Sequence, residues 1–159
     1  MFVWLPFLLG DLGCLASGFV AKFFHDRGVS LINSRRITFT IAAVIMMTIG
    51  LVSIVENPYI AVLLISIGAF SHQCLSTVAA TLGGDLFKKD EVATAVGMAG
   101  ACASSGQLIF NLFIGAFVHI IGFAPFFIAL AFFDIIGAIA LWTLIKVKDE
   151  EPQVQLATH

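Results

Sequence analysis

Five long apolar runs, each ended by charged or turn-forming residues, constrain this chain more than any other feature. A helix needs roughly 20 apolar residues to cross about 30 Å of hydrocarbon. The runs reach that length at about 1–21, 37–55, 58–84, 92–121 and 123–145. Transmembrane strands are shorter and alternate in polarity, so a barrel does not fit. The sequence therefore predicts an all-α polytopic membrane protein with five transmembrane helices.

Composition supports a lipid environment and excludes several classes of protein. The chain is 60% hydrophobic and 11% charged, which is not typical of a water-soluble domain. Its net charge of −2 argues against nucleic acid as a partner and leaves the lipid bilayer as the expected one. Cys14, Cys74 and Cys102 have no C-x-x-C partner, which favours packing over metal binding. Hydrolase and nucleotide-binding motifs are absent, so we expect no enzyme, no metal site and no cofactor.

Helix ends can be predicted from the turn residues. Asn57 followed by Pro58 is typical of an N-cap and first turn, and Asp90 is predicted to cap the fourth helix. Gly122 with Pro125 predicts a tight stop and restart. The fourth and fifth helices are therefore expected to form a hairpin.

The basic residues predict the orientation in the membrane. Lys and Arg concentrate on the cytoplasmic side, and here they fall in or beside the first loop, the third loop and the tail: Lys22, Arg27, Arg35, Arg36, Lys88, Lys89, Lys146 and Lys148. The C-terminus is thus expected inside and Met1 outside. Residues 147–159 are polar and predicted to be a disordered cytoplasmic tail. An apolar run that starts outside suggests that further spans come before it.

Two carboxyl groups are predicted at membrane depth. Asp134 lies near the middle of the fifth run and Asp11 halfway along the first. A charge at such a depth costs about 2.5 to 3.5 kcal/mol, so these residues are candidates for function. The structural alternative is a protonated carboxyl that is hydrogen-bonded to a neighbouring helix.

Neutral polar residues form strips on two predicted helices. The third helix carries one strip and the fourth another, and together they could line one aqueous cavity that binds sugar hydroxyls; the residues are His72, Gln73, Ser76, Thr77, Ser104, Gln107 and Asn111. Such groups also bond to their own helix or join helices, and this alternative remains open. His72 has no second ligand at metal-binding spacing.

Small residues recur every four positions along the fourth helix, at Ala93, Gly97, Ala101 and Ser105. Ridges of this kind let two membrane helices approach closely. We therefore expect this ridge to pack against another helix.

The order of four sequence blocks resembles a known transporter family. They read MFVWLPFLLGDLGCLASG, NPYIAVLLISIGAFSHQCLS, DLFKKDEVATAVGMAG and IGFAPFFIALAFFDIIGAIALWT. This order is similar to the C-terminal part of hexuronate transporters in the anion:cation symporter branch of the major facilitator superfamily. The resemblance covers residues 1 to about 146 and implies the eighth to twelfth of twelve helices. It implies a proton-coupled symporter fragment for sugar acids such as glucuronate and galacturonate, whose missing N-terminal half would be its partner.

The resemblance also ranks the candidate residues. In the family the eighth, tenth and eleventh helices face the cavity, which favours Asp11, His72, Gln73, Ser76, Gln107 and Asn111 over Asp134. The family's proton-carrying acid and the arginine that pairs with the substrate belong to the first half. The family's cytoplasmic loop signature is only partly kept, because Lys22 stands where the signature has an acid. The residues that resemble the signature are Gly18, Asp26, Arg27, Gly28, Arg35 and Arg36. Because of this departure, the inter-helix latch that the signature forms is not expected to be complete.

Two alternatives from other classes stay open. One is a self-standing five-helix membrane protein that oligomerises through the Ala93–Ser105 ridge and does not transport. The other is a decayed gene product that does not fold. Five helices alone are not expected to transport, because a cavity between two halves loses its far wall when one half is missing.

Overall fold

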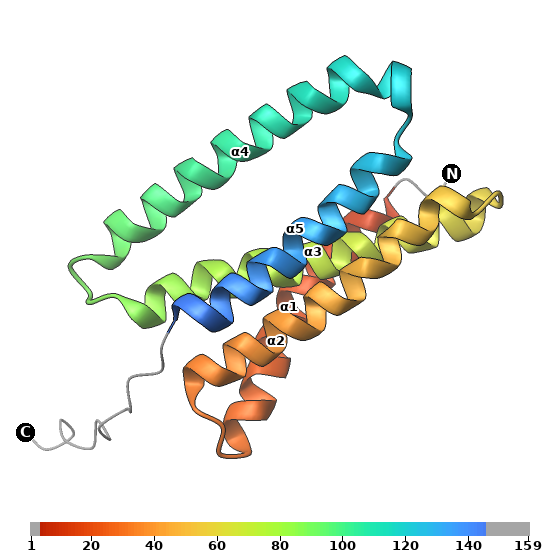
Figure 1. Ribbon diagram of the computed structural model, residues 1–159. Helices are drawn as coiled ribbons and strands as arrows, with labels where there is room; N and C mark the ends of the chain where they lie inside the picture. Colours follow the sequence, from red (N-terminus) through yellow and green to blue (C-terminus); the bar gives the residue numbers. More distant parts are fainter. Residues whose placement is uncertain (1–3, 146–159) are drawn as a thin grey trace, which may run out of the picture.

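The computed structural model describes residues 4–145, and within them it confirms the all-α prediction. Five helices are long and apolar enough to cross a membrane (Figure 1). The elements are α1 Leu5–Asp26, α2 Leu31–Met46, the 3-10 helix η1 Met47–Ile54, α3 Pro58–Leu86, α4 Val92–Ile121 and α5 Ala124–Leu144. The predicted tail at 147–159 lies outside the described residues.

Two of the predicted helix ends are confirmed and one is wrong. The Asn57 side chain accepts a hydrogen bond from the Tyr59 amide (3.0 Å) and caps α3. Gly122 ends α4 with a positive φ of 74°, which favours glycine. Asp90 does not cap α4, whose N-cap is Glu91 without a side-chain bond. The Lys88 carbonyl accepts from the Glu91 and Val92 amides, at 2.9 Å each, so Asp90 lies within the preceding turn and the helix begins one residue later than predicted.

The second predicted span changes its helix type near its middle. It begins as α2 and continues from Met47 as η1, a tighter 3-10 helix. The hydroxyl groups of Thr48 and Ser53 donate to carbonyls three residues earlier, at 2.8 and 2.7 Å. Bonds of that spacing accompany the three-residue turn of a 3-10 helix. The apolar run predicted a span but contained no signal for this change.

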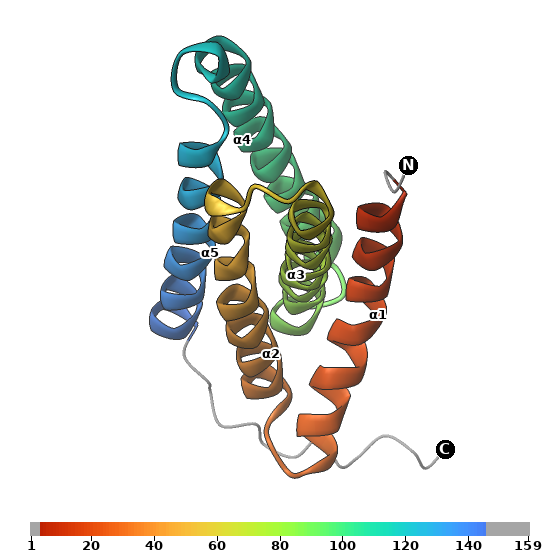
Figure 2. The same ribbon diagram turned by 90° about the vertical axis from the view of Figure 1, so that its right-hand side faces the viewer.

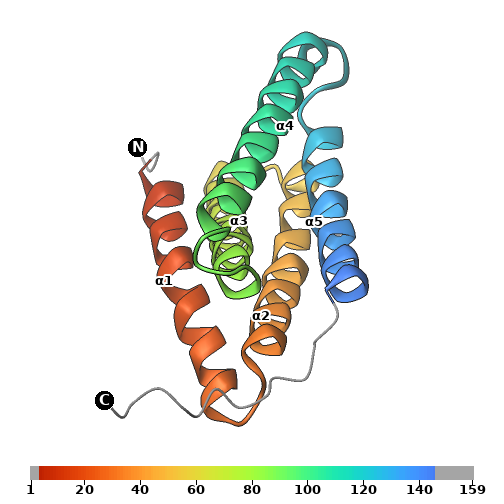
Figure 3. The ribbon, with the colours of Figure 1, turned by 90° about the vertical axis from the view of Figure 1, so that its left-hand side faces the viewer.

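Four of the helices form one packed bundle. Figures 2 and 3 show α3 between α1 and α2, with α5 on the other side of α2. The hydrophobic core lies where α2, η1, α3 and α5 meet, and it includes Phe39, Ala42, Ala43, Met46, Ile49, Cys74, Leu75, Val78, Ala131 and Ala138. The bundle therefore has its core away from α4.

Helix α4 stands apart from this bundle. It is joined to α5 by the predicted tight turn, but the two helices diverge from that turn (Figures 2 and 3). None of the residues of α4 is buried. Its contacts with α5 run through the ring of Phe110, which meets Phe126 and Phe133 edge to face at centroid distances of 6.2 and 6.3 Å. The described chain thus leaves α4 largely uncovered.

The connections lie at two opposite ends of the bundle. The α1–α2 and α3–α4 connections share one end, and the α2–α3 and α4–α5 connections share the other (Figure 1). Among the described basic residues, Lys22, Arg27, Arg35, Arg36, Lys88 and Lys89 all belong to the first end. This end is the one predicted to face the cytoplasm.

Candidate functional site

A long groove lies between α4 and the bundle. Its volume is about 1100 Å³, and α2, η1, α3, α4 and α5 contribute to its wall. Apolar side chains such as Phe39, Met46 and Leu75 form most of its floor. We call this space the groove.

The groove is closed where α4 touches its neighbours. Near the basic end, a Cβ added at Gly83 of α3 would meet Val96 of α4 at 3.0 Å, so these helices are in close contact there. At the other end, the contacts of Phe110 with the α5 rings bring α4 and α5 together. From the α3–α4 connection onward, α4 leans away from α3 (Figure 1).

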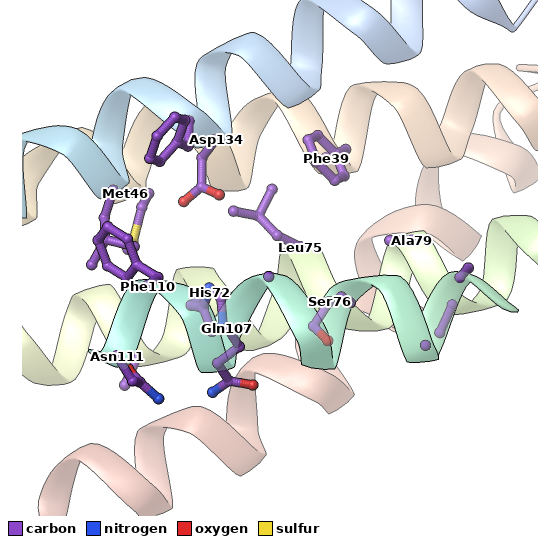
Figure 4. A pocket seen from close by; sticks show the side chains of 18 of the residues that line it. Phe39, Met46, His72, Leu75, Ser76, Ala79, Gln107, Phe110, Asn111 and Asp134 are labelled. Atoms are coloured by element: carbon purple, nitrogen blue, oxygen red, sulfur yellow. The ribbon is translucent and has the colours of Figure 1, made fainter. Parts of the chain in front are cut away.

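Four of the predicted cavity residues line the groove. They are His72 and Ser76 on α3 and Gln107 and Asn111 on α4. Figure 4 shows the amide groups of Gln107 and Asn111 on the side of α4 that faces α1. The structure therefore brings part of each predicted polar strip to the groove, two residues from α3 and two from α4.

The other predicted cavity residues lie elsewhere. Asp11 is exposed on α1, Gln73 is half-buried on α3, and Ser104 is exposed on α4; none of them lines the groove. Thr77 is engaged in helix packing, because its hydroxyl donates to the Gln73 carbonyl (2.8 Å) and lies 3.2 Å from the Cys14 sulfur. A cavity role for these four residues has no geometric support in the described chain.

Asp134, which the resemblance ranks low, lines the groove from α5. Its side chain lies on the side opposite the Gln107 and Asn111 amides, between Met46 and Leu75 (Figure 4). One carboxyl oxygen, Oδ2, is buried and has no hydrogen-bond partner among residues 4–145. A buried polar group without a partner is costly in lipid, so the free energy of this region would improve if Oδ2 gained a hydrogen-bond donor.

The closest helix packing was missed by the sequence reasoning. The α1–α3 interface is built on the buried small residues Gly10, Gly13, Ser17 and Ala21 of α1. A Cβ on Gly13 would clash with the backbone carbonyl of Phe70, and the Cys74 thiol donates to the Gly13 carbonyl at 2.9 Å. The spacing Gly13, Ser17, Ala21 is the four-residue rule already applied to α4, so the sequence contained the signal.

The predicted ridge on α4 meets no other helix in the described chain. Ala93, Gly97, Ala101 and Ser105 are exposed and lie outside the groove lining. A Cβ on Gly97 would find no atom within 4 Å. Their packing role therefore stays a prediction.

The loop residues form several contacts at the basic end of the bundle. Arg35 at the start of α2 pairs with Asp85 at the end of α3, at 3.0 Å, and this is the one ion pair of the described chain. Sequence reasoning did not pair these two residues. Gly28 has a φ of 87° in the α1–α2 connection, and Arg27 lies over the ring of Phe23. Gly18 and Asp26 are exposed.

Arg36 connects α2 with α5. It is 5% exposed, donates to the Asn33 side chain (3.1 Å) and lies over the indole ring of Trp142, 5.2 Å from its centroid. The Trp142 Nε1 in turn donates to the Thr40 hydroxyl at 3.0 Å. This contact joins the predicted loop motif to the last turn of α5.

Five apolar helices and an intramembrane groove with a few polar groups define a polytopic helical membrane protein. Residues 3–158 match the Major Facilitator Superfamily, and the chain belongs to this family. The chain is 42% identical, over its whole length, to proteins named hexuronate transporter from Escherichia coli K12 and from Escherichia coli O157:H7. It spans 37% of the length of each. A galacturonate transporter of Dickeya chrysanthemi is 36% identical over 63 residues, which are 39% of this chain and 18% of that protein.

Proposed function

We propose that this chain is part of a transporter for hexuronates such as glucuronate and galacturonate. The observation that carries the proposal is the 42% identity, over the whole chain, with the hexuronate transporters of Escherichia coli. The four polar residues that line the groove support this assignment. His72, Ser76, Gln107 and Asn111 would contribute hydrogen bonds to sugar hydroxyls.

The charge of the groove limits what this chain can do with such a substrate. No Lys or Arg lines the groove, so within the described chain no cation is placed to bind a carboxylate at membrane depth. A sugar acid would need that cation to offset its desolvation. We therefore propose that the carboxylate is bound by the part of the transporter that this chain lacks.

The remaining features of the proposal follow the family resemblance. The five helices would be the eighth to the twelfth of twelve, and transport would be proton-coupled symport by alternating access. The chain would be inactive until the N-terminal half is supplied. Its place would be the bacterial inner membrane, with the C-terminus in the cytoplasm.

Uptake by two co-expressed pieces tests the proposed substrate. The chain would be produced with the part of the Escherichia coli K12 hexuronate transporter that it does not match, in cells without hexuronate uptake of their own. We expect uptake of labelled galacturonate with both pieces and none with either alone. Absence of uptake, when both pieces are detected in the membrane, contradicts the proposal.

Two neighbouring residues of α4 provide a matched pair of variants for the same assay. Gln107→Ala removes a polar group of the groove, whereas Leu108→Ala changes an exposed residue outside the groove. Loss of one hydrogen bond to the sugar should raise KM by roughly tenfold for Gln107→Ala. We expect little change for Leu108→Ala, and equal effects of the two variants would argue against substrate binding in the groove.

Cysteine labelling tests the proposed orientation. In a Cys102→Ser background, Lys89→Cys and Glu56→Cys place thiols at exposed positions on opposite ends of the bundle. A membrane-impermeant maleimide applied to intact cells should label the Glu56→Cys protein, and should label the Lys89→Cys protein only after permeabilisation. The reverse pattern contradicts a cytoplasmic C-terminus.

A further inference from the structure

Asp134 is the only residue of the described groove lining with a carboxyl group, and it lies outside the two predicted polar strips. It comes from the middle of α5, and Figure 4 shows its carboxyl group directed into the groove. The residue is partly exposed, yet its Oδ2 atom is buried and has no hydrogen-bond partner within residues 4–145. Rotation about χ2 interchanges the two carboxyl oxygens, so either oxygen can be presented to a ligand.

The surroundings of Asp134 favour a neutral carboxyl group when a sugar acid is bound. Helices α2 and η1 contribute only apolar side chains to the groove, and α4 contributes the uncharged amides of Gln107 and Asn111. From α3 comes His72, the other titratable side chain of the described lining. An ionised carboxylate at membrane depth is costly without a paired cation. The carboxylate of a bound sugar acid would also repel it, so we take Asp134 to be neutral beside such a ligand.

A neutral carboxyl group matches the hydrogen-bonding capacity of a hydroxyl group. The protonated form has one O–H donor and keeps acceptor capacity. A hydroxyl group likewise donates and accepts, so a single sugar hydroxyl can pair with either oxygen of Asp134. Acyl chains have no hydrogen-bonding group, so lipid in the groove would leave the carboxyl group unsatisfied. The chemistry at this position therefore favours a hydroxylated ligand over lipid.

Aromatic rings flank Asp134 along α5. A Cβ added at Gly137, one turn beyond Asp134, would lie 3.6 Å from the Phe39 ring. Phe133, directly before Asp134, meets the Phe110 ring at a centroid distance of 6.3 Å. Small-molecule sites typically combine such aromatic walls with a few polar groups that fix the orientation of the ligand. The groove volume of about 1100 Å³ leaves room for a sugar ring beside the carboxyl group.

We propose that Asp134, as a neutral carboxyl group, binds a hydroxyl group of the transported sugar acid. Its carboxyl group lies on the side opposite the Gln107 and Asn111 amides, so it holds the ligand from the α5 wall of the groove (Figure 4). The carboxylate of the sugar acid then points away from Asp134, which avoids repulsion with any ionised fraction of this group. The inference rests on the proposed function in taking the ligand to be a sugar acid.

Binding of deoxy sugar acids tests this contact. Membranes contain the chain together with the unmatched part of the Escherichia coli K12 hexuronate transporter, and Kd is measured by competition with labelled galacturonate. The competitors are galacturonate and analogues that each lack one ring hydroxyl group. With the unsubstituted chain, the analogue that lacks the partner of Asp134 should bind roughly tenfold more weakly than galacturonate.

Substitution of Asp134 identifies this analogue. Asp134→Leu should raise the Kd of galacturonate roughly tenfold, and the analogue that lacks the partner hydroxyl should then bind as well as galacturonate does. A residue that only supports the fold would weaken galacturonate and every analogue by the same factor. If all analogues keep their discrimination in Asp134→Leu, the proposed contact is refuted. Asp134→Ala serves the same comparison where Asp134→Leu is absent from the membrane.

Two further variants test the charge and the position of the group. Asp134→Asn keeps a donor and an acceptor without a charge, so its Kd should stay within about twofold and its discrimination should be retained. A tenfold loss with Asp134→Asn would contradict a neutral carboxyl group and indicate a carboxylate that is held ionised by His72. Ile136→Ala, at an exposed position of α5 outside the groove, should leave Kd unchanged.

The same measurements separate this inference from the proposed function. No binding of galacturonate by the unsubstituted pieces, when both are detected in the membrane, contradicts both proposals. Binding by the unsubstituted pieces that is equally strong with Asp134→Leu contradicts the contact with Asp134 alone. An equal loss with Asp134→Leu and Ile136→Ala also contradicts this contact, because only one of these side chains lines the groove.

Discussion

Replacement of Gly13 by alanine tests the closest helix contact in the molecule. The added Cβ would overlap the Phe70 carbonyl oxygen and lie 3.0 Å from its carbon and 3.2 Å from its Cα. These are backbone atoms, so they cannot move aside as the end of a flexible side chain could. Helices α1 and α3 must separate, and the 2.9 Å bond from the Cys74 thiol to the Gly13 carbonyl is then lost.

The expected cost follows from these contacts. Overpacking of a tight interface costs about 1–3 kcal/mol of stability. A cost near 2 kcal/mol corresponds to a roughly 30-fold increase in the equilibrium constant for opening the α1–α3 interface. Cys74 is 5% exposed at this interface, so its thiol can be labelled only when the interface opens. The labelling rate of Cys74 should therefore rise by about the same factor.

The assay is thiol labelling of the purified chain in detergent, resolved residue by residue with mass spectrometry. Cys102 is exposed and reports the activity of the reagent. Gly18→Ala is the control on the same helix, because a Cβ at Gly18 would meet nothing within 4 Å. If Gly13→Ala labels Cys74 no faster than Gly18→Ala does, the close approach of α1 and α3 is refuted.

Three further changes can be measured by thermal unfolding in detergent. The Arg35–Asp85 pair is partly exposed, so Asp85→Asn should cost about 0.5–1 kcal/mol, and a double-mutant cycle with Arg35→Gln should show coupling of that size. Trp142→Phe removes the donor to Thr40 and should cost about 1 kcal/mol, and a double-mutant cycle with Thr40→Val should show coupling of about that size, although Thr40→Val also removes the bond to the Arg36 carbonyl. Gly122→Ala places a side chain at a φ of 74° and should cost about 1–2 kcal/mol; a neutral result would contradict the left-handed turn before α5.

The helices could be predicted from the sequence because each depends on local information. Hydrocarbon thickness fixes the length of a span, and charged residues end the apolar runs, so five segments follow without tertiary knowledge. Asn57 and Gly122 act on their own turns, and both predictions are confirmed. The prediction for Asp90 is wrong because a turn closed by the Lys88 carbonyl, which accepts from the Glu91 and Val92 amides, moves the helix start to Val92, and the sequence does not show this turn.

The candidate site could be predicted only in part, because it depends on which helix faces which. Spacing places Ser104, Gln107 and Asn111 near one strip of α4, but Ser104 lies outside the groove. Asp134 could be found by its depth in the membrane, yet its place beside the groove depends on how α5 packs against α2 and η1. Likewise, spacing finds small-residue ridges on both α1 and α4. Only the ridge on α1 meets the complementary surface of another helix in the described chain.

The uncovered state of α4 is physically consistent with a membrane helix. A water-soluble helix without buried residues would lose most of its stability, because that stability comes largely from packing an apolar face. In lipid the backbone hydrogen bonds of α4 are satisfied within the helix, and its apolar side chains are solvated by acyl chains. Insertion of α4 therefore does not require a neighbour. Any further helix contact of α4 would depend on close packing along small residues such as Ala95, Ala99 and Ala103, and not on hydrophobicity, because lipid is as apolar as the side chains it would replace.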